Sequence, residues 1–295
     1  MKVLNFGSLN IDYVYHVDQF VLPGETRSAL SQEINAGGKG LNQSIALARA
    51  GAEVYHAGCI GKEGQFLKEL LEETGVNTTF LKEVRAPQGN AVIEVDAHGE
   101  NRILLIHGSN DAIQKEDIPE VFSHFEKGDY LVLQNEINCL KEIVEEGNRK
   151  GMVIFLNPSP YNETIDTIDL TKINWLLVNE VEMAQITNES SPKEAYEILH
   201  QKYPQLSLVV TLGHQGSIAF DQDKVYEEGI YKVEAVDTTG AGDTYTGYFI
   251  ASLTKGKAIQ EAMHDASIAS AISVTRKGAA PSIPTYEEVK EKDVS

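Results

Sequence analysis

Short apolar runs alternate along this chain with longer segments of helical period, an order that few folds can accommodate. Apolar runs at residues 3–6, 53–59, 130–134, 153–156, 175–178 and 208–211 are expected to be buried strands. Segments with helical spacing lie between most of them, and those at residues 41–50 and 66–74 are expected to end at Gly51 and Gly75. This order predicts an α/β fold with a mostly parallel sheet between helices. Ligands bind such sheets at the carboxyl ends of the strands.

Two stretches interrupt the alternation, at residues 13–35 and 89–108. Each is predicted to be a pair of strands, with turns at residues 22–24 and 96–99. Four strands from two insertions would form a small sheet over the ends of the main strands, where a lid excludes water from a reaction. The expected organisation is therefore a main α/β domain of residues 1–12, 36–88 and 109–295, and a β-strand lid of residues 13–35 and 89–108.

The net charge of the chain is strongly negative. Lysine and arginine total 25 against 44 aspartates and glutamates, a formal charge of −19. This field opposes nucleic acid and anionic membranes, so neither is an expected partner, and any phosphate site must be local. The first residues carry no signal-peptide apolar run, and no segment approaches the roughly 18 apolar residues of a membrane span. The cytoplasm is the expected location.

A glycine turn near the C-terminal end, Asp237-Thr-Thr-Gly-Ala-Gly-Asp243, leads into a segment with helical apolar spacing. The N–H groups of residues 240 to 243 would point at a ligand from the positive end of the helix, which favours an anion in a transition state. Asp243 could accept a hydroxyl proton there, although capping of its own helix is the simpler alternative. None of the three Gly-Lys pairs completes a phosphate loop, and no dinucleotide fingerprint follows the first strand.

Eight short motifs occur in order along nearly the whole chain: Gly7-Ser-Leu-Asn-Ile-Asp12, Pro23-Gly-Glu-Thr26, Gly37-Gly-Lys-Gly-Leu-Asn42, Asn157-Pro-Ser-Pro160, Asn179-Glu-Val-Glu182, Thr211-Leu-Gly213, Asp237 to Asp243, and Thr275-Arg-Lys-Gly-Ala279. Together they resemble the ribokinase family of PfkB-type carbohydrate kinases. The resemblance implies a three-layer α/β sandwich with a small β-sheet lid. It also implies ATP-dependent phosphorylation of a sugar hydroxyl, with D-ribose converted to D-ribose 5-phosphate as the leading case.

The same resemblance assigns roles to individual residues. Asp243 would be the catalytic base, and Gly240, Ala241 and Gly242 would form the anion hole. The sugar hydroxyls would be bound by Asn10, Asp12, Gly38, Lys39, Asn42 and Glu136, and the nucleotide by Asn179, Thr211, Gly213 and Gly216. Glu182 would hold Mg²⁺ through water. Taken alone, Asn179 and Glu182 have the spacing of a helix-capping pair.

A potassium site is also implied by the resemblance. Its ligands would be Asp237, Thr239, Ser273, Arg276, Gly278 and Ser282, with Arg276 and Gly278 acting through backbone carbonyls. The bound K⁺ would balance the charge of Asp237 beside the anion hole. The alternative is a structural ion pair between Asp237 and Arg276.

The sequence departs from the family at a few positions. Gln88 and Asn90 flank the lid glycine, Asn135 precedes Glu136, and Tyr245 replaces a phenylalanine. Buried amides at the lid could change the accepted sugar, so a nucleoside kinase and a 2-keto-3-deoxy sugar acid kinase remain alternatives. A sugar-sensing protein without turnover is a non-enzyme alternative, against which the presence of Asp243 argues. The family resemblance further implies a homodimer formed through the lid.

Overall fold

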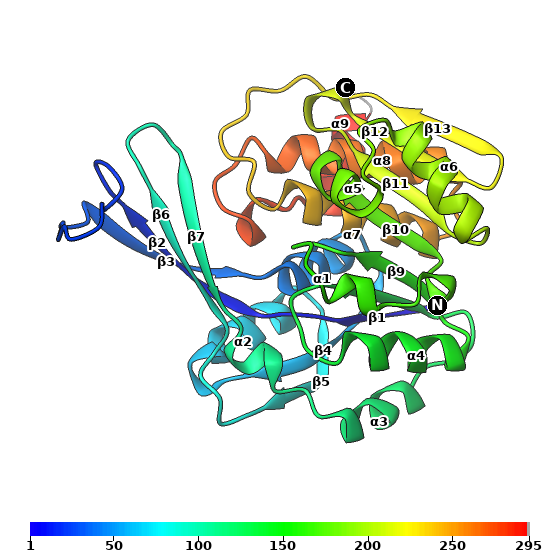
Figure 1. Ribbon diagram of the computed structural model, residues 1–295, viewed down its shortest axis with the longest axis horizontal. Helices are drawn as coiled ribbons and strands as arrows, with labels where there is room; N and C mark the ends of the chain where they lie inside the picture. Colours follow the sequence, from blue (N-terminus) through cyan, green and yellow to red (C-terminus); the bar gives the residue numbers. More distant parts are fainter. Residues whose placement is uncertain (294–295) are drawn as a thin grey trace.

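The central layer is one large twisted sheet. Within residues 1–293, which the computed structural model describes, its nine strands have the order β13-β12-β11-β10-β9-β8-β1-β4-β5 (Figure 1). All neighbours are parallel except for the antiparallel pairs β11–β12 and β12–β13. Their bounds are β1 (Lys2–Phe6), β4 (Glu53–Ile60), β5 (Asn77–Glu83), β8 (Tyr130–Gln134), β9 (Val153–Asn157), β10 (Trp175–Asn179), β11 (Ser207–Thr211), β12 (Ser217–Asp221) and β13 (Lys224–Glu228).

Helices cover both faces of this sheet. One face carries α1 (Lys39–Arg49), α2 (Gln65–Glu73), α7 (Ala241–Thr254), α8 (Ile259–Ser273) and α9 (Tyr286–Asp293). The other face carries α3 (Ile118–Ser123), α4 (Leu140–Lys150), α5 (Glu180–Thr187) and α6 (Pro192–Lys202). Short 3₁₀ turns connect elements at η1 (Lys62–Gly64), η2 (Gly108–Asp111), η3 (Lys115–Asp117), η4 (Ile165–Thr167), η5 (Leu170–Lys172), η6 (Gly213–Gln215) and η7 (Ala280–Ser282). None of the helices in residues 1–293 is both long and apolar enough to cross a bilayer.

Successive side chains along the strands point alternately into the two hydrophobic cores, one on each face of the sheet. Val3 and Leu177 point into one core, and Leu4 and Leu176 into the other. Because both faces are buried, the strands are nearly continuous apolar runs, which is why the sequence reveals them. The predicted three-layer α/β class is confirmed. The prediction missed β5, β12 and β13, which lie towards the two edges of the sheet and carry more polar residues.

A second, smaller sheet projects from the main body at the left of Figure 1. It has the order β3-β2-β6-β7, from β2 (Asn10–His16), β3 (Ser31–Gly37), β6 (Asn90–Val95) and β7 (Asn101–Ile106). The predicted turns are present: Gly24 and Gly99 have φ of 83° and 81°, the left-handed region that glycine tolerates. Strand β2 begins at Asn10, earlier than the predicted segment 13–35, so only Gly7, Ser8 and Leu9 separate the two sheets at this point.

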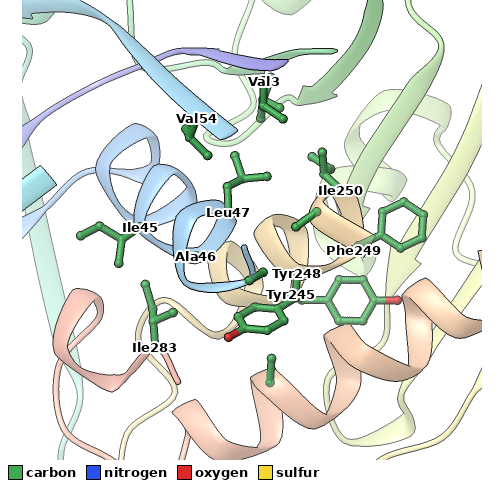
Figure 2. Close-up of a cluster of buried hydrophobic side chains, with 14 of the residues drawn as sticks. Val3, Ile45, Ala46, Leu47, Val54, Tyr245, Tyr248, Phe249, Ile250 and Ile283 are labelled. Carbon is green, nitrogen blue, oxygen red and sulfur yellow. The ribbon is translucent and has the colours of Figure 1, made fainter. Parts of the chain in front are cut away.

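Helices α1 and α7 pack closely together at Gly247. Figure 2 shows Ile45, Ala46 and Leu47 of α1 beside the aromatic side chains of α7 in one buried cluster. A Cβ atom added to Gly247 would lie only 2.3 Å from the Cβ of Ala46. Glycine at this position therefore lets the two helix backbones approach. As a result, the first turns of α1 and α7 meet at the same place.

Candidate active site

The carboxyl ends of the central strands open into one hollow. It lies between those ends and the start of α7, and its lining brings together eight of the predicted residues: Lys39, Asn179, Glu182, Thr211, Gly240, Ala241, Gly242 and Asp243. Asn157, Ser159 and Thr238 also line it. Parallel strands place their ends at the same edge of a sheet, which explains how residues so distant in sequence meet here.

The glycine turn before α7 has the backbone needed to bind an anion. Gly240 has φ of 74°, and a Cβ atom there would lie 2.9 Å from the Cβ of Ala279. A Cβ atom on Gly242 would meet no atom within 4 Å, so this glycine faces open space. The Ala241 N–H donates to the Thr238 carbonyl (3.2 Å), so in this structure it is already hydrogen-bonded within the turn, and its role in an anion hole stays a prediction. The N–H groups of Gly242 and Asp243 belong to the first helical turn, where partners within the helix are lacking.

Asp243 is held by two amides of α1. Its Oδ2 accepts from Asn42 Nδ2 at 3.0 Å and its Oδ1 from Gln43 Nε2 at 2.9 Å. Its side chain does not cap its own helix, so that simpler interpretation is wrong. Each carboxylate oxygen keeps a lone pair for a further donor. Asp243 is only 8% exposed, yet its carboxylate lines the hollow.

Glu136 and Asn10 belong to a second, smaller cavity beside the first. Its lining consists of Asn10, Leu105, Ile106, His107, Asn110 and Glu136, so β7 of the small sheet reaches it. Glu136 Oε2 accepts from Ser8 Oγ at 2.5 Å and from the Lys39 N–H at 2.9 Å. Asn110 Nδ2 donates to Asn10 Oδ1 at 2.7 Å. Glu136 thus ties the first strand's loop to the start of α1.

Asp12 lies beside Gly37 and close to Glu136. A Cβ atom on Gly37 would collide with the Asp12 carboxylate at 2.0 Å, so the glycine makes room for it. Burial, and secondarily the charge of Glu136, raises the pKa of Asp12 to about 7. Gly38, with φ of 93°, begins α1 next to the Asn10 N–H. A carboxyl group that titrates near neutral pH is consistent with a binding site for neutral hydroxyl groups.

On the opposite side of the hollow, Asn179 and Glu182 form a capping box. Asn179 Oδ1 accepts from the Glu182 N–H (2.8 Å), and Glu182 Oε2 accepts from the Asn179 N–H (3.1 Å). The capping interpretation is therefore confirmed, while both residues also line the hollow. Gly213 and Gly216 do not line it; a Cβ on Gly216 would lie 2.1 Å from the Glu228 carbonyl oxygen. Their role beside the phosphates stays a prediction.

The segments predicted to bind potassium are joined by Asp237. Its Oδ1 accepts from the Thr239 N–H (2.9 Å) and hydroxyl (2.6 Å), and its Oδ2 from the Gly278 N–H (2.8 Å). These bonds offset the effect of burial and lower the pKa of Asp237. Arg276 pairs with Glu288, so the alternative of an Asp237–Arg276 ion pair is wrong.

The hydroxyls of Ser273 and Ser282 are buried in the same region. They donate to the carbonyls of Ser270 and Ala279 at 2.8 and 2.7 Å. Each hydroxyl oxygen therefore keeps lone pairs for a cation. An oxygen-rich donor set with one carboxylate fits a large monovalent ion.

The polar residues that depart from the family have hydrogen-bond partners within the protein. Gln88 donates to the Leu9 carbonyl and accepts from the Gly61 N–H, so it braces the base of the small sheet. Asn135 donates to the Pro160 carbonyl at 2.6 Å. The Tyr245 hydroxyl donates to Ser217 at 2.8 Å. Gln88 and Asn135 are therefore both hydrogen-bonded to backbone groups, and their effect on the accepted sugar stays a prediction.

Several functional side chains were not found from the sequence. Ser8 and Asn110 orient Glu136 and Asn10, and Gln43 and Gln134 continue the contacts behind Asp243. Gln43 directly follows Asn42, and Gln134 ends an apolar run; a polar residue at the end of a buried strand was the available signal. Their partners come from distant segments, which local patterns do not reveal.

The chain is similar in sequence to known proteins over nearly its full length. Residues 1–286 match the pattern described as pfkB family carbohydrate kinase. The ribokinase of Haemophilus influenzae is 33% identical over 295 residues, covering 97% of this chain and 96% of the relative. The deoxyribokinase of Salmonella typhi is 30% identical over 302 residues, covering 99% and 98%.

Solved structures show the same similarity in three dimensions. The structure of Arabidopsis thaliana ribokinase complexed with ribose and ATP superposes with a TM-score of 0.89, at 29% identity, covering 99% of this chain and 97% of the other. Ribokinase from Cryptococcus neoformans in complex with ADP gives a TM-score of 0.87 at 33% identity, with 99% of each chain covered. Both sheets and all three layers are thus matched.

Proposed function

The chain belongs to the pfkB family of carbohydrate kinases, and on that premise we propose that it transfers the γ-phosphoryl group of ATP to the 5-hydroxyl of D-ribose. The observation that carries this proposal is the position of Asp243, held by two amides and lining a hollow that the first turn of α7 also faces. The names of the relatives support ribose as the sugar. Because ATP is supplied in the cytoplasm, we place the reaction there.

In this mechanism the oxygen of the sugar hydroxyl attacks the γ-phosphorus of ATP, and Asp243 accepts the proton of that hydroxyl. The bond between the γ-phosphorus and the oxygen that remains on ADP breaks in the same step. The N–H groups of Gly242 and Asp243 stabilise the charge on the transferring group. Asp12 and Glu136 accept hydrogen bonds from the other sugar hydroxyls. Glu182 Oε2 is used in the capping box, and its second oxygen would hold hydrated Mg²⁺ beside the phosphates. Mg²⁺ would neutralise the charge of the phosphates.

The sugar can be tested with one coupled assay of ADP formation on ribose, 2-deoxyribose, fructose 6-phosphate, a nucleoside and a 2-keto-3-deoxy sugar acid. We expect ribose to have the highest kcat/KM, because Asp12 and Glu136 repel an anionic sugar. The deoxyribokinase relative makes 2-deoxyribose the second candidate. In the lid, Arg27 is paired with Glu25 and Arg102 lies over the Phe20 ring at 4.1 Å, which disfavours a sugar acid. Binding of sugar without any ADP would support the sugar-sensing alternative instead.

We expect potassium to raise kcat several-fold over sodium or tetramethylammonium at fixed ionic strength. The ion would bind Asp237 and nearby oxygens, and a bound ion is often the largest charge in its site. Gly240 packs on Ala279, so an ion that orders the segment around Ala279 would also order the proposed anion hole at Gly240. Asp237→Ala should abolish the difference between salts, and Arg276→Lys, which keeps the backbone carbonyl, should retain it. Equal rates in all three salts for the wild-type enzyme would exclude the potassium site.

Sugar binding should weaken as the pH falls below about 7. The pKa of Asp12 is raised to about 7 by burial, so this carboxylate is ionised above that pH and protonated below it. The protonated form offers sugar hydroxyls fewer acceptors, and the sugar KM should rise up to about tenfold between pH 8 and pH 6 at an unchanged kcat. Steady-state kinetics of Asp12→Asn provide the comparison. A wild-type KM that is flat over this range, with the Asn variant matching it, would contradict the prediction.

We propose that the small sheet acts as a lid and pairs with a second copy of the chain. Strand β7 is an edge strand with Ile103, Leu104 and Ile106 each at least half exposed, and such an edge is a liability unless it is covered. Leu104→Lys should therefore shift a dimer towards monomer in light scattering. Lys224→Glu at the outer edge of the main sheet is the matched control. A wild-type mass of one chain at assay concentration would rule out the dimer.

A further inference from the structure

Five fully buried polar side chains lie in a row behind Asp243. They are Asn5, Gln43, Ser44, His56 and Gln134, and none of them lines the hollow. Asn5, His56 and Gln134 sit on the face of β1, β4 and β8 that Val3, Val54 and Val132 fill with apolar groups two residues earlier. Helix α1 covers this face and supplies Gln43 and Ser44. Burial of so many polar groups in an apolar core requires a reason.

The hydrogen bonds of this row admit one consistent direction. Gln134 Nε2 donates to Gln43 Oε1 at 2.7 Å and to Asn5 Oδ1 at 2.9 Å. With its oxygen occupied in this way, Gln43 turns its Nε2 towards Asp243 Oδ1. Were Gln43 reversed, its oxygen would face the carboxylate and its amide hydrogens would face those of Gln134. Gln134 therefore determines that Gln43 presents a donor to the base.

The far end of the row is fixed in the same way. Asn5 Nδ2 donates to the Gly40 carbonyl at 2.8 Å and to Ser44 Oγ at 2.7 Å, and the Ser44 hydroxyl can donate its hydrogen to His56 Nδ1, which lies 2.8 Å away. Burial lowers the pKa of His56 to about 4, so the imidazole is neutral at working pH and can accept this hydrogen. The row thus adds no charge behind the base.

Gln134 carries a cost that the fold alone does not explain. Its Oε1 is buried without a hydrogen-bond partner among the described residues. An unsatisfied buried acceptor destabilises a protein, so an apolar residue would serve the core better at this position. The arrangement is understandable if the two hydrogen bonds that Gln134 donates matter more than the missing hydrogen bond to its Oε1.

We propose that Gln43 is a positioning residue for the base, because its amide, locked by Gln134, fixes the orientation of the Asp243 carboxylate. Asn42 also bonds to Asp243, but its own Oδ1 is unpartnered and the family resemblance places it on the sugar. Gln43 has no access to the hollow, so its bond to Asp243 persists whether or not sugar is bound. This inference rests on the proposed function, in which Asp243 accepts the proton.

The test is the pH dependence of kcat in Gln43→Met and Gln134→Met. Loss of a donor makes a carboxylate take up a proton more readily. Gln43→Met should therefore move the acidic limb of the kcat profile to higher pH and lower kcat at neutral pH by about 10- to 100-fold, with a much smaller change in sugar KM. Gln43→Glu, which places a like charge beside the base, should move the limb further. Gln134→Met should show a weaker shift in the same direction.

A double variant separates positioning from general damage. If Gln134 acts through Gln43, the Gln43→Met/Gln134→Met enzyme should lose no more kcat than Gln43→Met alone. The matched control is Ser252→Ala, which removes a buried hydroxyl of α7 that donates to Asp265, far along the helix from Asp243. It should lower thermal stability and leave the pH profile unchanged.

Specific results would overturn the proposal. A Gln43→Met profile identical to wild type, or fully additive losses in the double variant, would show that the row serves packing alone. If Gln43→Met does not fold, the profile of Gln134→Met, which has no contact with Asp243, decides the question. Failure of the wild-type enzyme to phosphorylate any sugar in the panel would instead reject the proposed function. An active wild type, an inactive Asp243→Asn and an unshifted Gln43→Met would reject this inference alone.

Discussion

Replacing Asp243 by asparagine should lower kcat by about 10²- to 10⁴-fold, because the variant keeps the shape of the base but cannot accept the sugar proton. Two amide donors, from Asn42 and Gln43, face the carboxylate, and an asparagine has only one oxygen to offer them. Part of the loss will therefore reflect a displaced side chain. Sugar affinity, measured by calorimetry, should change far less than kcat.

The control for this experiment is Asp265→Asn. Asp265 is as buried as Asp243, at 8% exposed, and is bonded to Ser252 and Lys257 in α7–α8 packing outside the hollow. Its replacement should reduce stability without reducing kcat. An Asp243→Asn enzyme that retained more than about a tenth of wild-type kcat would remove Asp243 from the role of base.

Lys39→Met should lower kcat/KM for ATP by about 10²- to 10³-fold. Burial by itself would lower the pKa of the Lys39 ammonium, but the charges of Asp243, Glu136 and Glu182 outweigh it and raise the pKa. Without this cation Asp243 and Glu182 would face the anionic phosphates in a low-dielectric hollow, with Glu136 in the adjacent cavity, and leaving buried charges without their partner typically costs about 2 to 5 kcal/mol. Phosphate affinity, followed by ADP inhibition, should weaken together with kcat/KM.

The control here is Lys68→Met, at an exposed ion pair with Glu72 on α2. It should be kinetically neutral, because such surface pairs contribute little. If Lys39→Met kept kcat/KM within about threefold of wild type, the ammonium would have no electrostatic role in the hollow.

The alternation of apolar and amphipathic segments was sufficient to predict the layers, because strands buried on both faces leave a strong signal in the sequence. Tyr130–Gln134 coincides with the predicted strand, and each of the other predicted strands of the main sheet differs from the observed bounds by one residue at one end. Asp243 and Lys39, which the family resemblance assigns to the active site, line one hollow. The roles assigned within that hollow stay predictions until variants are measured.

The polar row behind Asp243 could not be predicted in the same way. Asn5 and His56 are aligned only because β1 pairs with β4, and Gln134 joins them only because β8 lies on the other side of β1. Strand order is a property of the assembled sheet and has no local pattern. Asn5 is a single polar residue within an apolar run, and nothing near it in the sequence indicates its three hydrogen-bond partners, Gly40, Ser44 and Gln134.

The contact between Gly247 and Ala46 lies one helical turn below the bonds that join Asp243 to Asn42 and Gln43. The spacing of the two helices at this contact therefore controls how closely their first turns approach each other. A methyl group added at Gly247 would push the helices apart, and Asp243 would move away from the amides of Asn42 and Gln43 although no residue of the hollow had changed. In this kinase the packing of the apolar interior is therefore expected to influence the position of Asp243, although neither Gly247 nor Ala46 lines the hollow.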